Sequence, residues 1–128
     1  MFSIGSNDPG YIEYKNNIII PKSQLISNIK KFIEISKKYT DKIIFTELIQ
    51  INNNITLPWI ANEYWNNEDM VEYDNIIENI CKEKNIDFIP LIDLLDIIED
   101  LEDGLHPNTK GHKKIYKRVK EFLENKII

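Results

Sequence analysis

The segment DGLHPNTKGH, at positions 103–112, combines an acid and a base at short spacing. Gly104 can adopt backbone angles that other residues avoid, so the chain can reverse between Asp103 and His106. Pro107 disfavours helical angles at His106 and holds that residue extended. The Asp103 carboxylate can then reach a ring nitrogen of His106, fix its tautomer and support a protonated imidazole. This is the role of the acid in an acid–histidine–nucleophile triad.

A second short motif, GSND at positions 5–8, follows an apolar run. Gly5 permits close backbone approach, and the Asn7 amide carries two N–H donors. One donor aimed at a developing oxyanion contributes about a hundredfold to a thousandfold in rate. Each motif also has a plain structural interpretation. Asp-x-x-His can decorate a surface turn, and Asn-Asp-Pro is common turn chemistry after a strand.

Composition narrows the class of protein. The 128 residues are 42% hydrophobic and 29% charged, which is typical of one globular domain over residues 1–128. A net charge of −5 argues against a nucleic-acid-binding protein, which needs a basic surface. Basic residues gather in the C-terminal segment 110–120, which we interpret as the solvated face of a helix rather than a membrane or RNA contact.

Cysteine and histidine usage gives no sign of a disulfide, a metal or a cofactor. Cys81 is the only cysteine and lies in a helical apolar pattern, so we expect it in the core. Two histidines and one cysteine make no ligand cluster. No apolar run reaches the roughly 18 residues of a membrane span, and the first residues do not resemble a signal peptide. We therefore expect a cytoplasmic protein without a membrane contact.

Hydrophobic periodicity predicts the elements that must position the two motifs. Apolar runs at 1–5, 42–51 and 86–91 predict buried strands. Helical spacing predicts helices over 23–38, 68–84 and 109–126, with Ser23 and Asn108 as N-caps of the first and last. Residues 52–67 show no period and predict a long loop, and residues 94–101 predict an irregular or short helical connector.

Strands that alternate with helices predict an α/β domain, a three-layer αβα arrangement around a flavodoxin-like parallel sheet. Ligands of such sheets bind beyond the carboxyl ends of the strands. GSND follows the first predicted strand, and DGLH follows the connector from the third. Both motifs can therefore face one crevice.

Taken in this order, GSND after a strand and DGLHPNTKGH before a last helix resemble the SGNH, or GDSL, hydrolases, a family of esterases and acylhydrolases. The resemblance covers essentially the whole chain. It implies that Asp103 is the triad acid and His106 the base. It also implies that Asn7, preceded by Gly5, belongs to the oxyanion hole. His112 then belongs structurally to the first turn of the last helix, although it could also be a second histidine of the site.

The sequence differs from this family at its N-terminus. The family's nucleophile is a serine in a Gly-Asp-Ser block that ends the first strand and precedes the asparagine block, where this chain has only four residues. None of the serines here follows Gly-Asp, and Ser6 is the only one expected near the crevice. We therefore expect an N-terminally truncated version of the fold and a poor esterase from this chain alone. If the family's sheet is retained, residues 1–5 form an exposed apolar edge.

Three explanations stay open. The chain could be the C-terminal part of a longer hydrolase. It could be half of an enzyme that a second polypeptide completes strand to strand at residues 1–5. It could also be a non-catalytic binding module that dimerises through the same edge.

The substrate that the family resemblance implies is a small acyl ester or an O-acetylated carbohydrate. Trp59, Tyr64 and Trp65 in the long loop could form an apolar or sugar-stacking wall, or could anchor the loop to the core.

Overall fold

The structure is a computed structural model that describes residues 1–127. Its centre is a parallel pair of strands, β3 (Ile44–Thr46) and β5 (Asp87–Ile89). Phe2 adds a third parallel position beside Phe45. The Phe2 N–H donates to the Ile44 carbonyl at 2.7 Å, and the Thr46 N–H donates to the Phe2 carbonyl at 2.9 Å. The predicted strands 42–51 and 86–91 therefore exist in the predicted parallel arrangement, whereas the predicted strand 1–5 is reduced to a single parallel bridge at Phe2.

All three strands are shorter than their apolar runs. At the N-terminus, Gly5 has a φ of 107°, in the left-handed region, and turns the chain away from the sheet. After Thr46, the main-chain N–H groups of Leu48 and Ile51 donate to side chains of a neighbouring helix instead of to a strand. Hydrophobicity continues through these residues because they stay buried, although the strand pairing has ended.

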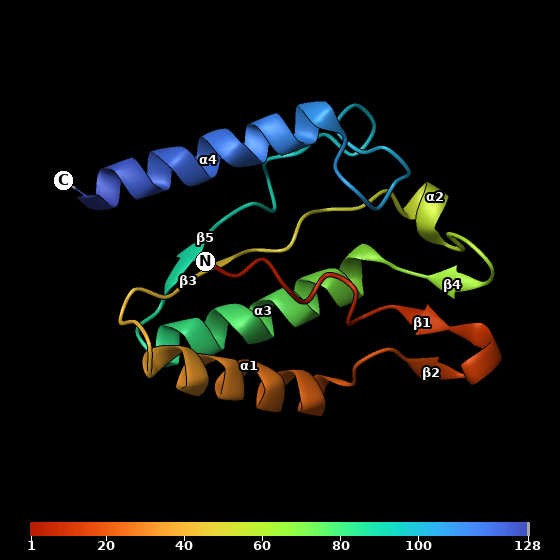
Figure 1. The fold of residues 1–128 in the computed structure, drawn as a ribbon. Helices are drawn as coiled ribbons and strands as arrows, with labels where there is room; N and C mark the ends of the chain where they lie inside the picture. Colours follow the sequence, from red (N-terminus) through yellow and green to blue (C-terminus); the bar gives the residue numbers. More distant parts are fainter. Residues whose placement is uncertain (128) are drawn as a thin grey trace.

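Helices α1 (Lys22–Lys37) and α3 (Asn67–Glu83) lie side by side on one face of the sheet, and α4 (Thr109–Ile127) lies on the other (Figure 1). All three were predicted. The α1 N-cap is Pro21, which makes no side-chain cap bond, so the prediction of Ser23 as N-cap is wrong. Asn108 does cap α4, because its Oδ1 accepts from the N–H groups of Lys110 and Gly111.

The core fills the space between the sheet and the α1 and α3 layer. Cys81 is fully buried there, as predicted. The fully or nearly fully buried side chains that α1, α3 and β3 contribute to this core include Leu25, Ile29, Ile33, Phe45, Met70, Tyr73 and Ile77.

A small antiparallel sheet beside the main one was not predicted. It has the order β2-β1-β4, formed by β2 (Asn17–Ile18), β1 (Tyr11–Ile12) and β4 (Glu63–Tyr64), with a short 3-10 helix η1 (Glu13–Lys15) between β1 and β2. The predicted loop 52–67 thus contains β4 and also a short helix, α2 (Asn53–Thr56). Strands of two residues carry too little alternation to show a period, so sequence pattern could not reveal them.

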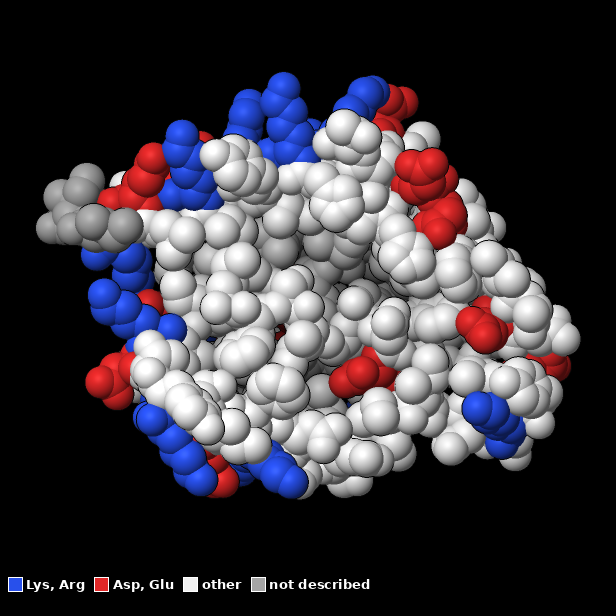
Figure 2. All heavy atoms as spheres, viewed as in Figure 1, with Lys and Arg blue, Asp and Glu red and all other residues white. Residues whose placement is uncertain are grey.

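The α4 side of the sheet is open. Tyr116 of α4 is 63% exposed, and the Ile115, Val119 and Leu123 side chains line a groove of about 430 Å³ that also borders Met1. Figure 2 shows a broad area of uncharged side chains between the lysines along α4 and the charged groups on the opposite side. Within residues 1–127, no helix is both long and apolar enough to cross a membrane.

Candidate active site

Asp103 and His106, which the sequence predicts as an acid–base pair, lie in direct contact. The Nδ1 atom of His106 lies 2.9 Å from Oδ2 of Asp103. The other carboxylate oxygen, Oδ1, accepts from the main-chain N–H groups of Leu105 at 3.0 Å and His106 at 2.8 Å. Gly104 makes this tight turn possible, since its φ is +83° and a Cβ there would lie 2.7 Å from Cβ of Ile55.

The electrostatics of Asp103 suit an orienting role. Burial is the largest influence on its pKa and raises it. The hydrogen bonds from the His106 ring and from the His106 and Leu105 N–H groups outweigh burial, so the pKa stays below its ordinary value. A carboxylate that is ionised at neutral pH accepts the proton of Nδ1. That arrangement leaves Nε2 of His106 as the free acceptor of the ring.

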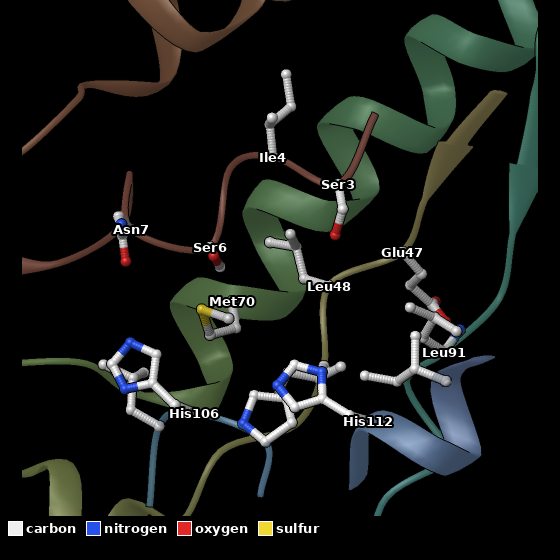
Figure 3. A pocket seen from close by; sticks show the side chains of 14 residues that line it. Ser3, Ile4, Ser6, Asn7, Glu47, Leu48, Met70, Leu91, His106 and His112 are labelled. Carbon is white, nitrogen blue, oxygen red and sulfur yellow. The ribbon is translucent and has the colours of Figure 1, made fainter. Parts of the chain in front are cut away.

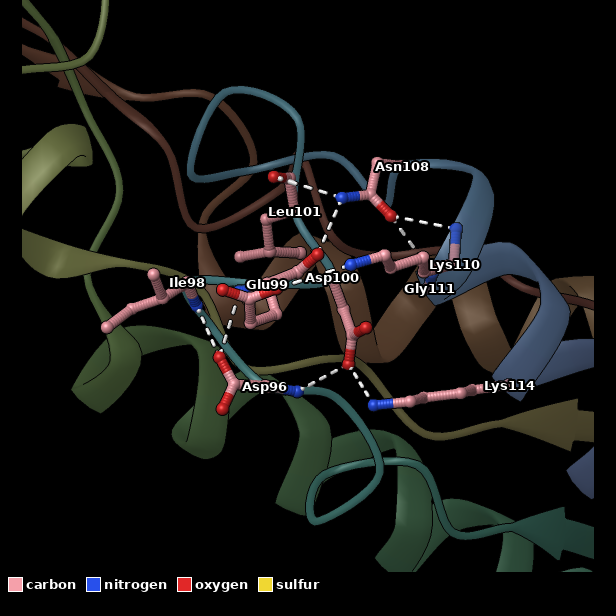
Figure 4. Close-up of polar contacts among 9 residues, drawn as sticks. All are labelled: Asp96, Ile98, Glu99, Asp100, Leu101, Asn108, Lys110, Gly111 and Lys114. Atoms are coloured by element: carbon pink, nitrogen blue, oxygen red, sulfur yellow. Dashed lines mark hydrogen bonds and ion pairs between the residues drawn. The ribbon is translucent and has the colours of Figure 1, made fainter.

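A polar network holds the loop that carries His106 against α4 (Figure 4). The buried Asp100 carboxylate accepts from the Asp96 N–H at 2.8 Å and pairs with Lys114 of α4. Asn108 caps α4 with its oxygen while its Nδ2 donates to the Glu99 carbonyl at 2.8 Å. The connector and the first turn of α4 are thereby joined at several points, which fixes the backbone on either side of His106.

Gly5 and Asn7 lie in the turn that follows Phe2, as predicted. The turn is closed by hydrogen bonds from the Asp8 N–H to the Gly5 carbonyl and from the Gly10 N–H to the Asn7 carbonyl. A Cβ on Gly5 would lie 2.9 Å from Cδ1 of Ile77, so glycine allows the turn to sit close to α3. The Asn7 side chain is exposed and borders the cavity described below.

One cavity of about 240 Å³ brings the two motifs together (Figure 3). Asn7 and Ser6 border it from the N-terminal segment, and His106 and His112 border it from the segment that leads into α4. Met70 and Leu48 contribute apolar lining. Asp103 and Gly5 do not line the cavity; each holds a lining residue in place.

The serines do not complete a triad within the described residues. Ser3 borders the cavity as well as Ser6, so the prediction that Ser6 is the only serine near it is wrong. Ser23, Ser27 and Ser36 belong to α1. Among residues 1–127, the His106 ring is hydrogen-bonded to Asp103 and to no serine hydroxyl. The same residues hold no group of three or more metal-ligating side chains.

The three aromatic residues of the loop 52–67 have different places. Trp65 is 4% exposed and anchors the loop in the core, while the Tyr64 ring lies 6.1 Å from that of Tyr11 across the small sheet. Trp59 lies against the site, with its ring centroid 5.6 Å from that of His106. Sequence singled out these aromatic residues but could not tell which one reaches His106, because the contact joins two loops.

Sequence reasoning missed one further residue near the site. Glu47, which follows β3, borders the cavity and accepts at 2.5 Å from the main-chain N–H groups of both Leu91 and Ile92. Its carboxylate therefore joins the segments that follow β3 and β5. A single glutamate at the end of an apolar run carries no spacing signal that would have identified this function.

Known proteins resemble this chain in sequence and in fold. The sequence model of the GDSL-like lipase/acylhydrolase family matches residues 1–119. A multidomain esterase of Ruminococcus flavefaciens is 31% identical over 75 residues, which are 54% of this chain and 10% of that protein.

Two solved structures share the fold. A GDSL-like lipase from Bacteroides thetaiotaomicron superposes with a TM-score of 0.68 at 20% identity, covering 96% of this chain and 60% of that one. A catalytic mutant of an acetylxylan esterase from Geobacillus stearothermophilus gives a TM-score of 0.66 at 18% identity, covering 91% of this chain and 55% of that one. The predicted α/β fold of the SGNH type is confirmed, and the chain spans little more than half the length of these structures. The chain belongs to the GDSL-like lipase/acylhydrolase family.

Proposed function

We propose that this chain supplies the acid–base half of a carboxylic ester hydrolase. The observation that carries the proposal is the 2.9 Å contact between Asp103 and His106 beside a cavity that Asn7 also lines. In this account, His106 is the general base, Asp103 orients it, and the Asn7 amide donates to the oxyanion, with Gly5 shaping the turn.

The nucleophile in this proposal is a serine on a strand from outside these 128 residues, carried by the same polypeptide or by a second one. The serine hydroxyl attacks the acyl carbonyl while Nε2 of His106 takes its proton. Asn7 stabilises the resulting oxyanion. As the intermediate collapses, His106 returns the proton to the departing alcohol, and water then releases the acyl group by the same steps in reverse.

The edge formed by residues 1–4 supports this proposal, since it can accept another strand. Phe2 directs both its N–H and its carbonyl toward β3. Along a strand, successive residues direct their N–H and carbonyl groups to opposite sides. The N–H and carbonyl groups of Met1 and Ser3, the neighbours of Phe2, therefore point away from β3. Neither residue's main chain has a hydrogen-bond partner among the described residues. Strand addition at such an edge would place the end of the new strand near the cavity.

The substrate in this proposal is a small acyl ester or an O-acetylated carbohydrate. The acetylxylan esterase with the same fold is consistent with an acetyl ester of a sugar.

The test is to add a strand that carries the serine nucleophile. The chain is expressed with the polypeptide encoded directly upstream in frame, or with a family strand that ends in Gly-Asp-Ser. Hydrolysis of p-nitrophenyl acetate and labelling by a fluorophosphonate serine probe are then measured. We expect turnover and labelling of the added serine, and neither in a matched strand that carries Gly-Asp-Ala. Equal turnover with the alanine strand, or labelling of Ser6, would contradict the proposal.

The same edge favours one alternative, a non-catalytic binding module that dimerises. It predicts a stable dimer of this chain at micromolar concentration in sedimentation experiments. It also predicts that no serine is labelled when any added strand is present.

A further inference from the structure

The Trp59 side chain touches both members of the Asp103–His106 pair. Its Nε1–H donates to the main-chain carbonyl of Asp103 at 3.2 Å. Its ring lies beside the imidazole of His106, with centroids 5.6 Å apart and ring planes inclined at 59°. The indole therefore contacts the backbone of the acid with its polar edge and the base with its aromatic surface.

Trp59 is held in place by contacts with Trp65 and with Glu63. Its ring packs edge-on against Trp65, with centroids 5.5 Å apart and an interplanar angle of 89°. Trp65 is buried under Gly10, where a Cβ would lie within 2.7 Å of the indole. The Trp59 main-chain N–H also donates to the Glu63 carbonyl at 2.8 Å. A series of contacts thus runs from the small sheet through Trp65 and Trp59 to the acid–base pair.

His106 needs such support because it is exposed. Its side chain is 56% accessible to solvent, and the hydrogen bond to Asp103 is its ring's single hydrogen bond among residues 1–127. An exposed imidazole with one hydrogen bond can rotate or exchange tautomers. The Trp59 ring packed beside the imidazole removes part of that freedom. The Nε1–H bond fixes the Asp103 main chain and so fixes the carboxylate that selects the tautomer.

We propose that Trp59 is a positioning residue for the acid–base pair. It keeps the His106 imidazole in the orientation and tautomer that receive the proton of an attacking hydroxyl. The inference rests on the proposed function of Asp103 and His106, but it can be tested without an ester substrate.

The test is nitrogen NMR of the histidine rings in the chain at pH 8, where ring shifts report which nitrogen carries the proton. In the wild type we expect His106 to be mainly the Nδ1–H tautomer. Trp59→Leu removes both contacts and Trp59→Phe removes the N–H bond alone. We expect the ratio of Nδ1–H to Nε2–H to fall by about threefold or more in Trp59→Leu, the factor that one ordinary hydrogen bond contributes. Trp59→Phe should lie between Trp59→Leu and the wild type.

Trp65→Phe is the matched control. It keeps an aromatic ring in contact with Trp59 and removes an Nε1–H that has no partner among residues 1–127, so it leaves both contacts of Trp59 with the acid–base pair in place. We expect the His106 ratio to stay at its wild-type value in this variant, and the His112 signals to stay unchanged in all three. An unchanged ratio in a folded Trp59→Leu chain would overturn the proposal, as would an equal fall in Trp65→Phe.

The outcomes separate this inference from the proposed function. A changed His106 tautomer in Trp59→Leu, together with no ester turnover when the Gly-Asp-Ser strand is added, would leave the positioning role standing and refute the hydrolase. Ester turnover that depends on His106 but not on Trp59, with an unchanged tautomer ratio, would support the hydrolase and refute the positioning role of Trp59.

Discussion

The two faces of the central sheet are built very differently. The face toward α1 and α3 is closed by fully buried side chains such as Phe45, Ile77 and Ile33. On the face toward α4, the inward stripe of the helix borders an open groove and the cavity beside it, and Tyr116 is largely exposed. The same sheet thus has one completed layer and one incomplete layer.

The site residues lie where these two faces meet. Asn7 follows the single sheet position of Phe2, and His106 lies in the loop that the polar network joins to α4. Both side chains border the cavity beside the open face. The closed face accounts for stability, and the groove of the open face borders Met1, at the sheet edge where a further strand would be added. Substitutions on the two faces should therefore behave differently.

The largest effect is expected in the closed face. Phe45→Ala removes a fully buried ring, so the free energy of unfolding should fall by about 3–5 kcal/mol. Urea unfolding followed by circular dichroism measures this loss. A loss below about 1 kcal/mol would mean that this face is not the packed one.

A buried carboxyl in the closed face should make stability depend on pH. Burial, and after it the nearby Glu47 carboxylate, raises the pKa of Asp74 from 3.8 to about 7, although the Leu48 N–H bond lowers it. Because the folded state holds the proton more tightly than the unfolded chain, stability should fall as pH rises from about 4 to about 7.

Asp74→Asn keeps an oxygen that accepts from the Leu48 N–H, and its amide has no proton to release as the pH rises. It should flatten that pH dependence and raise the free energy of unfolding at pH 8 by about 1–3 kcal/mol. Urea midpoints at pH 5 and pH 8 measure the change. A variant whose midpoints fall in parallel with those of the wild type would show that Asp74 is already ionised at pH 5.

A smaller effect is expected at the border between the faces. Asn108→Ala removes the cap of α4 and the bond to Glu99, and should cost about 1 kcal/mol of stability. Asn108→Asp keeps the capping oxygen and loses the bond to Glu99, so it should retain most of the stability. Equal losses in the two variants would show that the cap contributes little.

The smallest effect is expected in the open face. Val119→Ala trims a side chain that borders the groove, and should change the unfolding free energy of this chain by about 0.5 kcal/mol or less. Its urea midpoint is compared directly with that of Phe45→Ala. A loss as large as that of Phe45→Ala would erase the difference between the two faces.

Local patterns predicted most of this molecule. The three helices followed from apolar spacing, and the turn that joins Asp103 to His106 followed from Gly104 and Pro107, because these features are encoded within a few neighbouring residues. The strands were predicted too long, since burial continues after their pairing has ended at Thr46. The Trp59 contact joins two distant loops, which periodicity and spacing cannot represent.

The most direct test of the central claim is the effect of His106→Ala on ester hydrolysis, once the Gly-Asp-Ser strand has been added. Members of a triad act as a unit, so we predict that kcat falls by about a thousandfold or more while the urea midpoint stays unchanged. Undiminished turnover of p-nitrophenyl acetate in that folded variant would contradict the assignment of His106 as the base.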